Sequence, residues 1–241
     1  MKPNQRLFVS APLGEGCRVA LESGQAHYLA NVLRLPLGGE VLLFNGHDGE
    51  WVAQLTSIGK RGGEARCVRQ SRPQDNVPNL WLLFAPVKGD RTDYIAEKAT
   101  ELGAAGIIPV ITERTIVRKV NVEKLRARCV EAAEQCERLS VPEVSDAVPL
   151  GKIFESLDDD EILLFADEAG DNSTIAAALA GKPIKVSLLT GPEGGFTPSE
   201  REKLRACASV CAVSLGPRIL RADTATFAGL AIIQSVWGDW K

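Results

Sequence analysis

The first seventy residues alternate between short apolar runs and glycine-rich turns, which is typical of a small all-β module. Alternating apolar or β-branched residues occur in five runs, residues 6–10, 18–21, 40–45, 50–58 and 64–72. Between the second and third runs, Leu29, Val32 and Leu33 repeat at helical spacing and predict a helix over residues 25–34. Several short strands at close spacing favour a small β-barrel over residues 1–73.

A change of pattern follows this module. Residues 73–79 are polar and include two prolines, so residues 74–79 predict a linker. Beyond it, apolar strands are expected at residues 80–85, 106–111, 161–166, 184–190 and 210–215. Helical periodicity runs over residues 91–102 and from about 122 to 139. Strands that alternate with helices predict an α/β domain over residues 80–241, built on a largely parallel sheet.

Ligands of such sheets bind beyond the carboxyl ends of the strands, which directs attention to residues 189–196. This segment reads Leu-Thr-Gly-Pro-Glu-Gly-Gly-Phe, and its three glycines leave backbone groups open to a ligand. Thr197, Pro198 and Glu200 predict the start of a helix behind it. The spacing matches neither the dinucleotide fingerprint nor the phosphate-binding P-loop, and a plain tight turn is the alternative.

A second strand end, residues 215–225, reads Leu-Gly-Pro-Arg-Ile-Leu-Arg-Ala-Asp-Thr-Ala. Ile219 and Leu220 are apolar where a loop is usually polar, and Arg218 and Arg221 stand on either side of them. The pattern indicates a pocket that offers an apolar face beside an anionic group. The alternative is a buried crossover whose two arginines form ion pairs.

Composition narrows the classes of protein. Of the 241 residues 45% are hydrophobic and 24% charged, as in ordinary soluble globular proteins. No apolar run approaches the roughly 20 residues of a membrane span, and the N-terminus lacks the apolar core of a signal peptide, so a cytoplasmic protein is expected. Six cysteines without a C-x-x-C pair, together with two histidines, argue against a metal site.

The charge is unevenly distributed along the chain. Residues 1–73 carry nine Lys and Arg against six Asp and Glu, whereas residues 74–241 carry 19 against 25. A basic module on an acidic body suggests that the N-terminal part meets a polyanion. An uneven solvated surface explains the same numbers equally well.

The two strand-end segments together closely resemble the SPOUT superfamily of RNA methyltransferases. Within that superfamily they resemble the ribosomal RNA uridine-N3 methyltransferases of the RsmE type. Further blocks of the same family are matched by residues 26–35, by residues 88–91 with 97–103, and by residues 131–138 with 141–143. The resemblance therefore covers nearly the whole chain in the same order.

The resemblance implies a PUA-like or OB-like RNA-binding barrel, followed by a SPOUT α/β domain that ends in a deep trefoil knot. It implies a homodimer that methylates N3 of a uridine in the decoding region of 16S rRNA. The cofactor is S-adenosylmethionine, with no metal, held largely by backbone groups. The implied cofactor-binding residues are Leu189, Thr190, Gly191, Gly195, Leu215, Gly216, Ile219, Leu220 and Thr224.

Methylation at N3 requires loss of the N3 proton, so the site needs a base or cations that stabilise the anion. Arg221 is our first candidate for orienting or stabilising the uracil, and Arg138 is the second. Glu193 and Asp223 are candidates for positioning or proton removal, although each acid is equally suited to pairing with a neighbouring arginine. Asp223 is a departure, because the family usually has glutamate at this position.

His27 and Arg34 lie seven residues apart on the expected N-terminal helix, which predicts one face for RNA phosphates. A satisfied surface pair is the alternative for these two residues. Two other functions remain open for the chain: another SPOUT methyltransferase that acts on a ribose 2′-hydroxyl of RNA, and a non-catalytic RNA-binding or ribosome-assembly protein.

Overall fold

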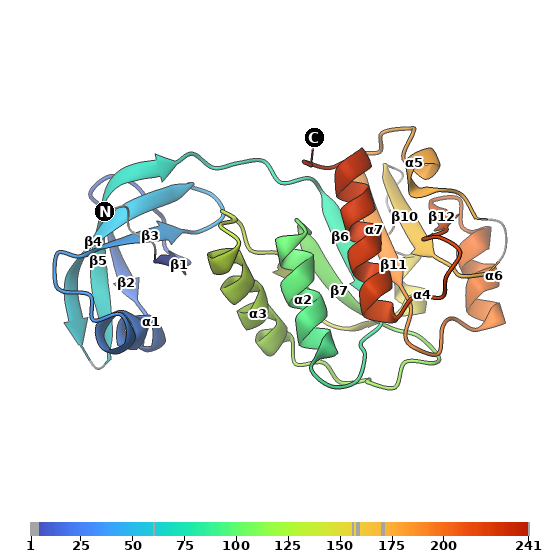
Figure 1. The fold of residues 1–241 in the computed structure, drawn as a ribbon, viewed down its shortest axis with the longest axis horizontal. Coiled ribbons are helices and arrows are strands. Elements are labelled where there is room, and N and C mark those ends of the chain that lie inside the picture. The colour runs from blue at the N-terminus through green and yellow to red at the C-terminus, as the bar shows by residue number, and fades with distance from the viewer. Residues whose placement is uncertain (1–4, 60, 156, 158–159, 170–171, 241) are drawn as a thin grey trace. The chain divides into compact units, whose positions relative to one another are not determined.

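The computed structural model describes residues 5–59, 61–155, 157, 160–169 and 172–240. The chain divides into two compact units (Figure 1). The first comprises Met1–Asn76 with Ala133–Val141, and the second comprises Val77–Ala132 with Pro142–Lys241. Each unit is built around a hydrophobic core of its own. None of the helices in the described ranges is both long enough and apolar enough to cross a membrane.

The first unit contains the five strands that the alternating pattern predicts. In sheet order they are β1 (Arg6–Phe8), β3 (Glu40–Phe44), β4 (Glu50–Gly59), β5 (Gly62–Arg72) and β2 (Arg18–Leu21). The β1–β3 pair is parallel and the other pairs are antiparallel. Val41 and Leu43 on β3 and Val19 and Leu21 on β2 are buried, because alternate side chains of a strand face the same side. The β-rich first module is confirmed.

The helix of the first unit differs from the one expected. It consists of α1 (Ser23–His27) and a π-helical turn, η1 (Tyr28–Val32), with Leu29 fully buried. Arg34 lies beyond the helix end and has a left-handed backbone, with φ of 53°. The expectation that His27 and Arg34 share a helix face is therefore wrong, because the π turn changes the spacing of side chains and the helix stops at Val32.

The segment Ala133–Val141 belongs to the first unit although it begins inside a helix whose earlier residues belong to the second. The helix α3 (Val122–Gln135) ends earlier than its periodicity predicts, and Glu137 has a φ of 62°. Arg6 caps this end: its Nη1 donates to the carbonyls of Ala133 (2.8 Å) and Glu134 (3.1 Å). Four orphan carbonyls at a helix end need such donors, so one buried arginine fixes the segment to the sheet.

Glu50 holds Arg6 in place. Its carboxylate accepts hydrogen bonds from Arg6 Nε (2.7 Å), Arg72 Nη2 (2.9 Å) and Ser71 Oγ (2.6 Å), and its side chain is only 6% exposed. Burial alone would raise the pKa of this carboxyl, but the hydrogen bonds from Arg72, Ser71 and Arg6 outweigh it and lower the pKa to about 2.

We expect this carboxylate to make the protein acid-sensitive. Because the folded pKa lies below the ordinary 4.5, the stabilisation is complete above pH 4.5 and disappears as the pH falls toward 2. It corresponds to roughly 3 kcal/mol of unfolding free energy. Urea titrations of the wild type and Glu50→Gln at pH 7 and pH 3 measure it. Glu50→Gln should be less stable than the wild type at pH 7, and its unfolding free energy should fall less than that of the wild type between pH 7 and pH 3.

The control is Glu64→Gln, because the Glu64 ion pair with Arg18 spans 3.7 Å and is exposed to solvent. An exposed pair of this kind contributes well under about 1 kcal/mol, so this variant should follow the wild type at both pH values. An identical response of Glu50→Gln and wild type to acid would contradict the role given to Glu50.

The second unit contains a parallel sheet with helices on both faces. In sheet order its strands are β12 (Val210–Val213), β10 (Glu161–Ala166), β11 (Lys185–Thr190), β6 (Leu80–Phe84), β7 (Gly106–Ile111) and β8 (Glu143–Val144), with the short β9 (Val148–Pro149) beside β7. The pairs are parallel throughout. The predicted parallel α/β sheet is confirmed.

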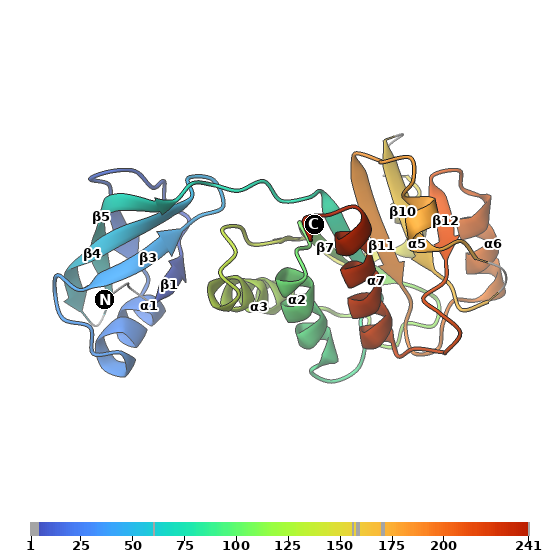
Figure 2. The same cartoon turned by 45° about the horizontal axis from the view of Figure 1, so that its top comes forward.

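Two groups of helices cover this sheet. Figures 1 and 2 show α2 (Arg91–Glu101) and α7 (Ala222–Val236) on one face and α6 (Pro198–Ala206) on the other. The short helices are α4 (Leu150–Ile153) and α5 (Ile175–Ala178). Strands β10, β11 and β12 are neighbours, so the segments that follow them meet at one edge of the sheet. The trefoil knot that the resemblance implies stays a prediction.

Candidate active site

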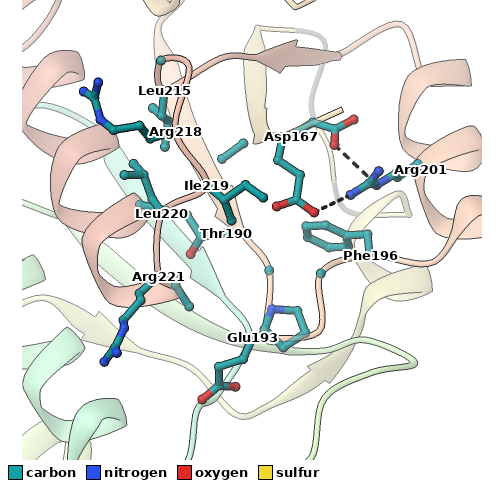
Figure 3. A pocket seen from close by; sticks show the side chains of 18 residues that line it. Asp167, Thr190, Glu193, Phe196, Arg201, Leu215, Arg218, Ile219, Leu220 and Arg221 are labelled. Atoms are coloured by element: carbon teal, nitrogen blue, oxygen red, sulfur yellow. Dashed lines mark hydrogen bonds and ion pairs between the residues drawn. The ribbon is translucent and has the colours of Figure 1, made fainter. Parts of the chain in front are cut away.

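A cavity of about 290 Å³ opens at this edge of the sheet, as Figure 3 shows. Its walls come from the ends of three neighbouring strands and the start of α7. The lining residues are Ala166, Asp167 and Glu168 at and after the end of β10, Thr190–Glu193, Gly195, Phe196 and Arg201 at and after the end of β11, and Leu215, Gly216, Arg218–Ala222 and Ala225 after β12. Both segments singled out in the sequence therefore line one cavity, and the end of β10 joins them.

The end of β11 is fixed to the start of α7 by two buried hydroxyls. Thr226 Oγ1 donates to the carbonyl of Ala222 (2.8 Å), so it accepts the hydrogen bond that links it to Thr190 Oγ1 (2.9 Å). Both threonines are at most 2% exposed. Buried hydroxyls that satisfy each other hold a defined geometry, and here they hold together the two segments that line the cavity.

Backbone conformation keeps the loop after β11 open toward the cavity. Gly195 has a φ of 66°, which side chains disfavour, and its N–H donates to the carbonyl of Pro192 (2.9 Å). A Cβ on Gly191 would lie 2.7 Å from the Phe196 ring, which itself packs edge-on against Phe165 at 4.9 Å. Main-chain groups are therefore what this loop presents to a ligand.

Behind the loop, α6 begins with the cap that the sequence predicts. Thr197 Oγ1 accepts from the N–H of Glu200 (3.2 Å), and Glu200 Oε2 accepts from the N–H of Thr197 (2.8 Å). The other oxygen of Glu200 accepts from the N–H of Glu113 (2.8 Å), and Arg114 Nη1 donates to the carbonyl of Gly194 (2.8 Å). The loop after β7 thus braces the glycine loop.

The loop after β12 supplies the apolar wall. Ile219 is 84% exposed, which is unusual for an apolar side chain, and it points toward the middle of the cavity in Figure 3. Arg218 and Arg221 extend away from that middle. Arg221 is the N-cap residue of α7 but its side chain makes no capping hydrogen bond. Within the described ranges the Arg221 guanidinium forms no ion pair, so it stays available to an anionic group.

Ionic contacts form the opposite wall, which the sequence reasoning missed. Asp167, whose side chain is fully buried, pairs with Arg205 Nη2 (2.7 Å) and Arg201 Nε (3.4 Å). Arg201 Nη2 also donates to Glu168 Oε1 (3.2 Å). Figure 3 shows Arg201 between two carboxylates. One sequence feature could have identified this wall: residues 167 and 168 directly follow a predicted strand of the same sheet.

The acids proposed for proton removal have different surroundings. Glu193 lines the cavity and lies 3.8 Å from Arg91, and the two side chains are 38% and 40% exposed. Pairs this exposed are weak, so Glu193 keeps access to solvent and ligand. Asp223 is not among the lining residues, and its Oδ1 accepts from the N–H of Thr224 (2.8 Å) in the first turn of α7.

The remaining predicted residues fall into two groups. Leu189 has a fully buried side chain in the core of the second unit, and Thr224 is exposed on α7 outside the cavity wall. His27, Arg34 and Arg138 belong to the first unit. His27 and Arg34 are exposed there, whereas Arg138 contacts Ser140 Oγ (3.2 Å) and accepts from Arg6 through its carbonyl. No group of histidine, cysteine, aspartate or glutamate suited to a metal ion occurs within the described ranges.

Comparison with known protein families identifies the class of protein to which this chain belongs. Residues 73–234 match the family described as RNA methyltransferase domain, and residues 21–66 match the RNA methyltransferase PUA domain. The chain therefore belongs to the RNA methyltransferase family, with a PUA-type module at its N-terminus. That match agrees with a parallel sheet whose strand ends form a backbone-lined cavity.

Individual relatives narrow this class. The ribosomal RNA small subunit methyltransferase E of Rickettsia conorii is 34% identical over 97% of this chain and 96% of its own. The crystal structure of the enzyme of that name from Neisseria gonorrhoeae, bound to S-adenosyl methionine, has a TM-score of 0.90 at 29% identity, covering 98% and 99% of the two chains. A SAM-bound methyltransferase from Legionella pneumophila has a TM-score of 0.87 at 28% identity, covering 97% and 98%.

Proposed function

We propose that this protein transfers a methyl group from S-adenosylmethionine to N3 of a uridine in the decoding region of 16S rRNA. The observation that carries the proposal is the cavity at the ends of β10, β11 and β12, in a chain whose SAM-bound relatives align over nearly their full length. The name of the Rickettsia relative supports small-subunit ribosomal RNA as the substrate.

The cavity suits this cofactor in three respects. Its glycine loop exposes main-chain donors and acceptors, Ile219 and Leu220 offer an apolar face, and charged groups stand at its edges. We assign cofactor contacts to the lining residues Thr190, Gly191, Gly195, Leu215, Gly216, Ile219 and Leu220. Leu189 and Thr224 would support these segments from the core and from α7. When bound, the cofactor supplies an electrophilic methyl group on a sulfonium.

The residues around the opening then act on the base. Arg221 would stabilise the negative charge that develops on the uracil as N3 loses its proton. Glu193 is the acid better placed to accept that proton, because it lines the cavity and is only weakly paired with Arg91. Asp223 would act on orientation through the first turn of α7. Arg138 remains a second candidate for contact with the uracil.

The target nucleotide must be unpaired or flipped out, since N3 lies on the Watson–Crick edge. We assign its flanking RNA to the first unit, with His27 and Arg34 as exposed phosphate contacts. An excess of basic over acidic residues in this module supports the assignment.

Arg34→Ala should therefore weaken RNA binding roughly three- to tenfold. It should also lower the slope of log Kd against log salt concentration by about one. The affinity for S-adenosylmethionine should not change, because Arg34 belongs to the other unit. Filter binding of a 16S rRNA fragment at several salt concentrations, beside calorimetry with the cofactor, measures both. Equal losses of RNA and cofactor affinity would show that Arg34 only supports the fold.

We further propose a cytoplasmic homodimer, because ribosomal RNA is cytoplasmic in bacteria and α7 leaves apolar side chains uncovered. Ile232 and Val236 on α7 are 39% and 41% exposed, and Tyr94 on α2 is 45% exposed. Exposed apolar side chains on neighbouring helices are typical of interfaces between subunits. Sedimentation equilibrium tests the dimer, and a monomeric mass at micromolar concentration would contradict it.

The reaction itself is tested in cells that lack the corresponding gene. Mass mapping of their 16S rRNA should show an unmethylated uridine in the decoding region, and expression of this chain should restore N3-methyluridine. A ribose 2′-O-methyl group restored instead would establish the alternative SPOUT activity. No stabilisation of the purified protein by saturating S-adenosylmethionine in a thermal-shift assay would favour the non-catalytic alternative.

A further inference from the structure

Glu168 stands in the cavity without a role in the function proposed above. It follows β10, lines the cavity and pairs with Arg201, and its side chain is half exposed. The side chain of its neighbour Asp167 is fully buried, pairs with Arg201 and Arg205, and accepts a hydrogen bond from the N–H of Ala169. Asp167 is therefore engaged with the protein, and Glu168 is the more exposed acid of this wall.

The carboxylate of Glu168 is held in a fixed place. Arg201 Nη2 donates to its Oε1 at 3.2 Å, and the same arginine is anchored from behind by Asp167. A Cβ on Gly195 would lie 3.4 Å from this oxygen, so the glycine loop passes directly beside the carboxylate. A positioned carboxylate beside exposed backbone is built to accept hydrogen bonds from a ligand.

We propose that Glu168 binds the vicinal hydroxyl groups of the cofactor ribose, an inference that rests on S-adenosylmethionine being the ligand. Two carboxylate oxygens match two adjacent hydroxyl donors, and an acid at a strand end serves the same purpose in dinucleotide-binding folds. Figure 3 shows Arg201 and Asp167 to one side of Ile219 and Arg221 to the other. The reacting methyl belongs near Arg221, so the nucleoside part lies toward Glu168.

The experiment measures the binding of three ligands to the wild type and to Glu168→Gln by calorimetry, without turnover. S-adenosylhomocysteine carries both hydroxyls, and its 2′-deoxy and 3′-deoxy analogues each lack one. Glu168→Gln should raise the Kd of S-adenosylhomocysteine about tenfold or more, as expected for losing hydrogen bonds to a charged acceptor. The deoxy analogues should bind the wild type more weakly than S-adenosylhomocysteine does. In Glu168→Gln this difference in Kd should be several-fold smaller.

Glu202→Gln is the matched control, since Glu202 is exposed on α6. This substitution removes the same charge outside the cavity. Glu168→Ala provides a second variant, and because Asp167 still holds Arg201, the wall should persist in both. A Kd for S-adenosylhomocysteine that Glu168→Gln leaves unchanged overturns the inference. The inference is also overturned if Glu168→Gln weakens the binding of all three ligands by the same factor. Glu168 would then contact the methionine ammonium group of the ligand instead of its ribose. If wild type binds none of the three, the proposed cofactor itself fails and the inference falls with it.

Discussion

Arg221→Ala should lower the methyl-transfer rate about 10²- to 10³-fold, the loss typical of removing one group that stabilises developing negative charge. The guanidinium stands beside the cavity without an ion pair in the described part of the chain, so the substitution leaves no orphaned acid behind. Because the side chain makes no capping hydrogen bond, α7 should keep its stability. The substitution should therefore lower the turnover rate and leave the stability of the fold unchanged.

Single-turnover methylation of 16S rRNA by the variant, with saturating cofactor, measures this rate. Calorimetry should give a cofactor Kd within about threefold of wild type, and the melting temperature should stay close. Lys203→Ala is the matched control, because Lys203 is an exposed cation on α6 away from the cavity. An unchanged rate in Arg221→Ala would remove this residue from the mechanism.

Much of this site could be predicted because its signals are local. Glycines at a strand end and apolar residues in a loop conflict with their immediate surroundings, and such conflicts mark functional segments. Thr197 and Glu200 form the expected cap because it depends on residues three positions apart. The parallel sheet follows from the alternation of strands and helices, which needs no tertiary knowledge either.

The wall built on Asp167 and Glu168 could not be predicted in the same way. Its partners Arg201 and Arg205 are more than thirty residues away, and an Asp-Glu pair after a strand is ordinary by itself. Only the order of strands, with β10 between β12 and β11, shows that this strand end belongs beside the other two. Strand order is a property of the assembled sheet, and the five strands expected from the sequence allow many orders.

Long-range contacts also explain the differences in the first unit. The periodicity of α3 continues to Leu139, yet the helix ends at Gln135, where buried Arg6 binds its last carbonyls. Arg6 lies more than 120 residues earlier in the sequence, so no local pattern marks this end. Tertiary contacts override helical periodicity here, as they commonly do at helix ends.

Gly195→Val should weaken S-adenosylmethionine binding roughly 10²- to 10³-fold, because two penalties act together. The backbone at residue 195 has a φ of 66°, which costs a side chain of this kind about 1–2 kcal/mol. The first side-chain atom would also stand 3.4 Å from Glu168 Oε1, and a valine would fill the space that the ligand needs.

The control separates these two penalties. Gly38 also has a left-handed backbone, with φ of 81°, but belongs to the first unit and has open space around its position. Gly38→Val should therefore show the strain as a lower melting temperature while the cofactor Kd stays within about threefold of wild type. Calorimetry and thermal melts of both variants give the two quantities. If Gly195→Val binds the cofactor as tightly as Gly38→Val does, the glycine loop after β11 is a turn and the cofactor is held elsewhere.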